Sequence, residues 1–300
     1  MKNSKLTFVF GFILMTSAAI GQDYAFKVMA NKGTNEVKSG SEWVAIKTGV
    51  SLSPGDELKV SENSYLGLIH RTGKPLEIKQ SGNYKVADLA ASVSGGASVL
   101  NKYTDFILSS NSAEAKKNRL SATGAVHRGF GLDVFLPTLG EKERQFVFSS
   151  KATIAWEESN EGPFEVTIES LFGDELMKLE TPENQISINL KDPKLASESS
   201  FLVQVRSKSD QNVKSDPHMI RNLSGPQLDQ ISKAYEEIKP QVSGENALQK
   251  YLLAGFFEEN GLLIDASTAY LEAIKLAPDV PTYKESYEDF LIRNKFKSPK

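Results

Sequence analysis

The sequence contains no cysteine in 300 residues. Disulfide bonds, thiolate metal sites, a cysteine nucleophile and a lipid-modified cysteine are therefore excluded. Only three histidines occur, His70, His127 and His218, and they lie in separate segments without the paired spacing of a histidine zinc site. We therefore expect no metal ion and no cofactor.

The chain also has little net charge, because its acidic and basic residues nearly balance. The formal net charge is −3, so nucleic acid and anionic membrane surfaces are not expected partners. Neither a phosphate-binding glycine motif nor a G-x-S-x-G nucleophile elbow is present. Hydrophobic residues at 40% and charged residues at 24% are typical of a globular chain, and 300 residues favour more than one domain.

The first 21 residues have the pattern of a signal peptide. Lys2 and Lys5 precede an apolar run over 6–20, and Ala19-Ile20-Gly21 forms a small-x-small cleavage site before Gln22. The alternative is an uncleaved anchor helix, but the run is shorter than the roughly 20 apolar residues that a membrane span needs. We predict a bacterial periplasmic or secreted protein with no membrane span after cleavage.

Residues 22–90 contain short apolar runs separated by turn signals such as Ser53-Pro54-Gly55-Asp56. This rhythm predicts a small antiparallel β barrel or roll. The expected strands are 26–28, 43–46, 58–60, 65–69, 76–78 and 84–86.

The same segment resembles the periplasmic FecR-type domain. The resemblance implies binding of other proteins or envelope ligands without catalysis. FecR-type regulators carry a cytoplasmic helical segment where this chain has a signal peptide. The matching positions are Trp43, Ile46, Gly49, Leu52, Gly55, Asp56, Leu58, Tyr65, Leu68, Gly73, Leu76, Ile78 and Tyr84.

Residues 91–140 are predicted to form a helix and a linker. The apolar stripe over 94–110 has helical spacing, and the small polar residues of 109–129 indicate a linker. Residues 141–207 return to strands, with clean alternation in "FEVTIES" after Trp156. This part resembles an immunoglobulin-like or fibronectin-type-III β-sandwich.

Residues 208–300 are expected to be helical after Pro217. Ser224 is expected to begin the first helix, Pro240 to end it and Ser243 to begin the next. The following helix pair resembles one tetratricopeptide repeat. Its matching positions are Leu253, Ala254, Phe257, Gly261, Ala266, Tyr270, Ala273 and Pro278. The predicted fold class is therefore multidomain β plus α.

Asp56, His70 and Arg71 could suggest an active site, since they share one short stretch. However, Asp56 stands in a turn that favours aspartate, and His70 and Arg71 are expected in solvent beside Thr72-Gly73. His127 and His218 are likewise expected on the surface or in a linker. The adjacent acids Glu258 and Glu259 diverge on a helix and are expected on a solvated face.

We therefore predict a non-enzymatic adaptor or sensor that binds an envelope protein or a cell-wall component. Its candidate partner-binding residues are Leu248, Tyr251, Leu252, Tyr283 and Tyr287. The alternative for these residues is packing within the chain.

Two other functions stay open. One is a cell-wall glycan hydrolase or lyase with an interdomain site, for which Asp56, His70 and His127 are the candidates. The other is a structural wall-binding protein.

Overall fold

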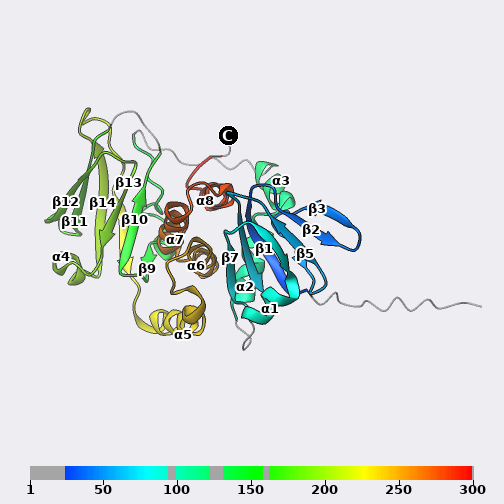
Figure 1. Ribbon diagram of the computed structural model, residues 1–300. Coiled ribbons are helices and arrows are strands. Elements are labelled where there is room, and N and C mark those ends of the chain that lie inside the picture. The colour runs from blue at the N-terminus through cyan, green and yellow to red at the C-terminus, as the bar shows by residue number, and fades with distance from the viewer. Residues whose placement is uncertain (1–23, 94–98, 122–130, 158–161, 299–300) are drawn as a thin grey trace, which may run out of the picture.

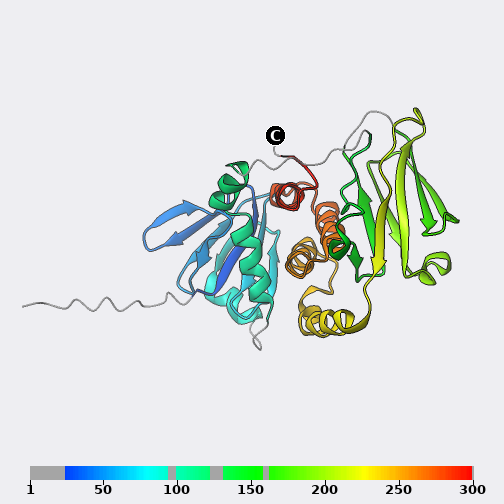
Figure 2. The same cartoon turned by 180° about the vertical axis from the view of Figure 1, so that it is seen from behind.

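The computed structural model describes residues 24–93, 99–121, 131–157 and 162–298. Two β units lie on opposite sides of a central group of helices (Figure 1), and the view from behind shows the same arrangement with left and right exchanged (Figure 2). The described residues form mixed β sheets and several C-terminal helices, without a closed barrel. The expected β plus α class is therefore confirmed. The N-terminal unit, for which a small barrel or roll was predicted, does not close into a barrel.

The N-terminal unit consists of two four-stranded sheets that enclose a small apolar core. Six of its antiparallel strands overlap the expected apolar runs, whereas β2 (Glu36–Ser39) and β4 (Ser51–Leu52) were not expected. The helix α1 (Val86–Val93) begins at the residue that was expected to end the last strand. The first sheet contains, in order, β4 (Ser51–Leu52), β1 (Phe26–Lys32), β6 (Tyr65–His70) and β7 (Pro75–Ile78), and the second contains β3 (Glu42–Ala45), β2 (Glu36–Ser39), β5 (Glu57–Val60) and β8 (Gly82–Lys85).

Two helices follow this unit. The predicted helix over 94–110 is observed as α2 (Leu100–Ser110), and residues 94–98 lie outside the described residues. The expected linker contains the helix α3 (Ala113–Ser121), so the prediction of a linker without regular structure is wrong for these residues. Lys116 of α3 pairs with Asp289 at 2.8 Å, so tertiary contact supports a helix with little apolar character of its own.

The second β unit packs one sheet on another. Trp156 and Phe164 meet edge to face in its core, with ring centroids 5.1 Å apart. The larger sheet has the order β12 (Glu175–Thr181), β11 (Phe164–Ser170), β14 (Ser200–Ser207), β15 (His218–Asn222) and β9 (Phe146–Val147), and the smaller pairs β10 (Lys151–Ala155) with β13 (Gln185–Asn189). A 3-10 turn, η1 (Lys142–Arg144), and the short helix α4 (Pro193–Ala196) complete the unit.

Strand β15 corrects the expectation that the chain is helical after Pro217. His218–Asn222 alternates buried and half-buried side chains and pairs with β14 on one side and β9 on the other. The run is short, and its ladder partners are distant in sequence. Local spacing alone therefore could not identify it.

The C-terminal helices are α5 (Gly225–Val242), α6 (Ala247–Glu259), α7 (Leu263–Leu276) and α8 (Pro281–Arg293). Pro240 lies inside the last turn of α5 and does not end it, so the expected end at Pro240 is wrong. The cap of α6 is Asn246 rather than Ser243, since the Asn246 side chain accepts from the Gln249 amide at 2.9 Å. Gly261, at φ +74°, makes the turn between α6 and α7.

One hydrophobic core runs through all three parts of the molecule. It joins Met29 and Tyr65 of the N-terminal unit to buried residues of α6–α8 and to Ala155 of the sandwich. Gly255 lets α2 approach α6, because a Cβ there would lie 2.5 Å from Ile107 Cδ1. Of the helices in the described part of the chain, none combines the length and the apolarity that crossing a bilayer requires.

Candidate ligand cavity at the edge of the sandwich

A cavity of about 490 Å³ lies at the edge of the sandwich. Three segments line it: residues 131–141 before β9, residues 214–218 that lead into β15, and Lys295–Phe296 after α8. Backbone hydrogen bonds fix the first two segments, from Leu132 N to Lys214 O at 3.2 Å and from Phe135 N to Ala155 O at 2.9 Å. Gly131 allows this approach, because a Cβ there would lie 1.9 Å from Lys214 O. Backbone hydrogen bonds therefore hold the two segments in place at the cavity.

His218 is one of the polar residues that line this cavity. Its side chain is 8% exposed, and Nδ1 lies 3.2 Å from the carbonyl oxygen of Pro137. Since a carbonyl only accepts, Nδ1 carries the proton and Nε2 of the neutral ring is an acceptor. Among the described residues, no hydrogen bond reaches Nε2. Nε2 is therefore the ring nitrogen that is able to accept a hydrogen bond.

Burial lowers the pKa of His218. The Pro137 carbonyl and the charges of Asp216 and Asp133 act in the opposite direction, but burial dominates. His218 is therefore neutral at pH 7. Its described hydrogen bond goes to a backbone carbonyl, whereas a catalytic triad orients its histidine with a carboxylate.

The rest of the lining is mixed. Apolar walls come from Leu132, Val134, Leu136 and Phe296, while charged side chains of both signs stand beside them. One of these, Glu141, is already engaged: its carboxylate accepts from Thr138 N at 2.9 Å and pairs with Arg144. In the ranges that the structure describes, no group of three or more His, Asp or Glu could hold a metal ion. The arrangement suits a small ligand with both an apolar face and hydrogen-bond donors.

Asp56 and His70 do not line this cavity. Asp56 has the expected turn role, since Oδ2 accepts from Ser53 N at 2.7 Å. The expectation of solvated histidines is wrong for both described rings. His70 is buried on β6, with Nδ1 2.8 Å from Thr72 Oγ1 and its ring against Phe26. Strand β6 lies between β1 and β7, so its last residue is buried even though a turn follows. The third histidine, His127, lies outside the described residues.

The five residues expected to contact a partner are all buried within the chain: Leu248, Tyr251, Leu252, Tyr283 and Tyr287. Leu248 packs on Gly67, and its amide donates to Glu77 Oε1 at 2.9 Å. The Tyr283 hydroxyl lies 2.7 Å from that of Tyr65. The alternative expectation, packing within the chain, describes their positions, so none of them offers an open surface to a partner.

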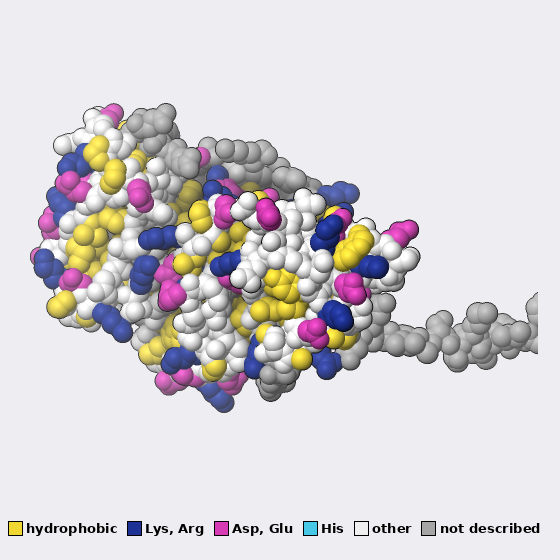
Figure 3. Space-filling view, in the orientation of Figure 1, with side chains coloured by type: hydrophobic (Ala, Val, Ile, Leu, Met, Phe, Trp, Pro, Cys, Tyr) yellow, Lys and Arg dark blue, Asp and Glu magenta, His cyan; other side chains and the backbone are white. Residues whose placement is uncertain are grey.

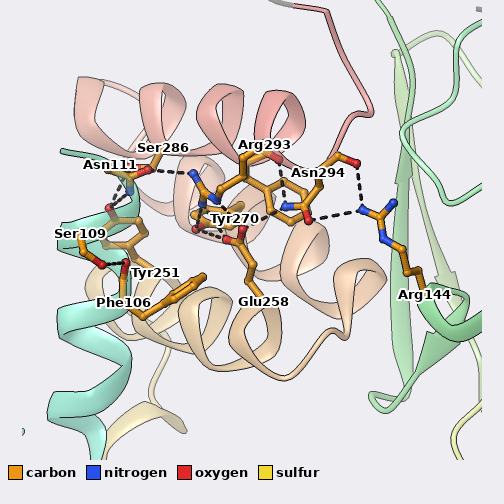
Figure 4. Close-up of polar contacts among 11 residues, drawn as sticks. Phe106, Ser109, Asn111, Arg144, Tyr251, Glu258, Tyr270, Ser286, Arg293 and Asn294 are labelled. Atoms are coloured by element: carbon orange, nitrogen blue, oxygen red, sulfur yellow. Dashed lines mark hydrogen bonds and ion pairs between the residues drawn. The ribbon is translucent and has the colours of Figure 1, made fainter. Parts of the chain in front are cut away.

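A second buried polar group joins the helices (Figure 4). Glu258 accepts from Arg293 Nε at 2.5 Å and from Tyr270 Oη at 3.1 Å, while Arg293 also donates to Asn111 Oδ1 at 3.1 Å. The expected solvated position of Glu258 is therefore wrong, since an arginine 35 residues away neutralises it. This group connects α2, α6, α7 and α8, and a buried, fully paired charge of this kind serves the fold.

Neither a scan against protein-family models nor a search of curated proteins finds a match for the chain. The resemblances to FecR-type, immunoglobulin-like and tetratricopeptide domains therefore stay predictions from the sequence.

Proposed function

We propose that the protein is an exported interaction protein of the bacterial cell envelope, an adaptor or sensor that binds without catalysis. The observation that carries the proposal is the cavity lined by His218, whose lining segments are held by backbone hydrogen bonds and include this neutral imidazole. The signal-peptide pattern and the FecR-like motif support the compartment and the binding role.

The shared core also supports an adaptor. Both β units pack on the same helices, so the cavity and the N-terminal unit are held at a fixed separation. Figure 3 shows basic and acidic side chains interspersed over one face, with hydrophobic side chains in small patches. Such a surface favours recognition by shape and hydrogen bonding over attraction to a polyanion.

Photo-crosslinking in the native envelope tests this function. A photoreactive residue replaces Leu139 at the cavity, and the matched control replaces Leu276; the two leucines are 44% and 43% exposed. We expect a discrete adduct with an envelope protein or wall fragment from position 139 only, and its loss when His218→Phe is added. Equal adducts from both positions, or none from position 139, would contradict the proposal.

A cell-wall glycan hydrolase or lyase is the second candidate, because an imidazole nitrogen in a cavity can also accept a proton. Incubation of purified wall material with the chain and with His218→Asn distinguishes the two. Release of new reducing ends by the unaltered chain alone favours the enzyme. Co-sedimentation without release, unaffected by His218→Asn, favours a structural wall-binding protein.

A further inference from the structure

The β11–β12 hairpin ends in an exposed apolar pair, Leu171 and Phe172, here called the tip. Phe172 is 95% exposed and Leu171 is 50% exposed. An aromatic ring held in water at the end of a hairpin is unusual in a chain that buries most of its aromatic residues.

The backbone of the tip is held in place. Ser170 Oγ accepts from Phe172 N at 3.1 Å and from Asp174 N at 3.2 Å, and Ser170 N donates to Asp174 O at 2.8 Å. Gly173 supplies the positive φ of +89° that the turn requires. The Phe172 ring is therefore presented on a preorganised loop, which lowers the entropy lost on docking.

A groove of about 510 Å³ lies between α5, α6 and the end of β9, and is here called the groove. Helix α5 leaves part of its apolar stripe uncovered, since Leu228 and Tyr235 are only half buried. The groove is lined mainly by Val147, Phe148, Leu228, Tyr235, Leu253 and Phe257. Its lining suits an aromatic side chain.

The tip and the groove lie at the same end of one sheet. Across that end the register pairs Ser170 with Phe201, Ser200 with Arg221, and Asn222 with Val147. The tip follows Ser170, and Asn222 and Val147 line the groove. Three strand spacings, about 15 Å, separate the two features.

We propose that two copies of this chain associate about a two-fold axis, with the tip of each copy in the groove of the other. Tip and groove lie at the same end of the sheet, and a two-fold axis that places one tip in the partner's groove also places the partner's tip in the first groove, which closes the dimer. Charge also matches: the exposed Asp174 follows the tip, next to Glu175, which lies 3.5 Å from Lys178 of its own strand, and the exposed Lys191 lies at the groove.

The dimer is weak. A buried aromatic side chain contributes about 150–250 Å², so two tips supply well under the roughly 1,600 Å² of a standard interface. We expect dissociation constants in the micromolar range and a concentration-dependent equilibrium.

Sedimentation of the full chain tests the association. We expect the dimer fraction to rise with concentration, and Phe172→Ser to weaken the dimer at least about tenfold. The matched control is Val44→Ser, since Val44 is also exposed, at 58%, but lies on β3 of the other unit. A monomer throughout the micromolar range, or equal weakening by both variants, would overturn the proposal.

The absence of cysteine allows a geometric test of the same contact. Phe172→Cys and Leu228→Cys chains are mixed and oxidised, and we expect a covalent dimer that contains one chain of each kind. Phe172→Cys mixed with Leu276→Cys is the control, because Leu276 is exposed but does not line the groove. Equal yields from the two mixtures would show random collision and refute the proposed pairing.

Discussion

The two β units are attached to the helices by different chemistry. At the N-terminal junction the contacts are phenolic and apolar, and the Glu77 carboxylate accepts from both Tyr65 and the Leu248 amide. The Tyr65 hydroxyl lies 2.7 Å from that of Tyr283 and donates to Glu77 at 2.6 Å, while Leu248 packs on Gly67. Burial raises the pKa of Tyr65 and Tyr283 above the ordinary value of 10, so both phenols keep their protons at physiological pH.

At the sandwich junction the central group is a buried carboxylate. Asp265 of α7 accepts from Phe148 N and Ser149 N, both at 2.8 Å, and Thr268 Oγ1 accepts from Thr153 N at 2.8 Å. Burial raises the pKa of Asp265 to about 6, against the opposing effect of these amide donors. The stability of the sandwich junction is therefore expected to change between neutral pH and mild acid. The stability of the tyrosine pair at the other junction is not expected to change in that range.

The largest effect is expected when the buried carboxylate is removed. Asp265→Ala leaves the Phe148 and Ser149 amides without their acceptor, which costs about 2–4 kcal/mol of unfolding free energy. Urea unfolding followed by circular dichroism measures it. Asp229→Ala, which removes an exposed carboxylate from α5, serves as the control and should change stability by less than about 0.5 kcal/mol. Equal losses in the two variants would contradict the role of Asp265.

The pH dependence of the same junction follows from the raised pKa. The folded state holds the Asp265 proton more tightly than the unfolded chain. The stabilisation of the folded state that this proton supplies is therefore complete below about pH 4 and is lost as the pH rises through 6. Relative to Asp265→Asn, the unaltered chain should lose up to about 3 kcal/mol between pH 4 and pH 7.

The histidines do not affect the difference in unfolding free energy between the unaltered chain and Asp265→Asn. Burial lowers the pKa of His70 and His218, so their contribution is lost as the pH falls, the opposite direction, and it is present in both chains. The measurement is the difference in unfolding free energy at matched pH values. A constant difference across this range would show that Asp265 does not titrate there.

A smaller effect is expected at the N-terminal junction. Tyr283→Phe removes one hydroxyl from the pair with Tyr65 and should cost about 1 kcal/mol, independent of pH between 4 and 8. A double-mutant cycle with Tyr65→Phe isolates the contact, and we expect a coupling of about 0.5–1 kcal/mol. Tyr287→Phe, on the same helix but bonded to Ser267, should show no coupling to Tyr65→Phe. Additive losses in the Tyr65–Tyr283 cycle would exclude the proposed contact.

Much of the secondary structure could be predicted, but little of the candidate site. Alternation in "FEVTIES" and the Gly261 turn identified β11 and the α6–α7 pair, because these signals depend on neighbouring residues. His218 gave no such signal: its burial depends on pairing with Val203 and on the Pro137 carbonyl.

By itself, the sequence determined the absence of thiol chemistry, the spacing of most strands and helices, and the apolar residues available for a core. Only the tertiary structure decided which polar groups are buried and which apolar ones are exposed. Glu258 lies inside because Arg293 reaches it, and Phe172 lies outside because its hairpin extends beyond the sheet. Such outcomes depend on partners tens to hundreds of residues away, which local patterns of hydrophobicity do not encode.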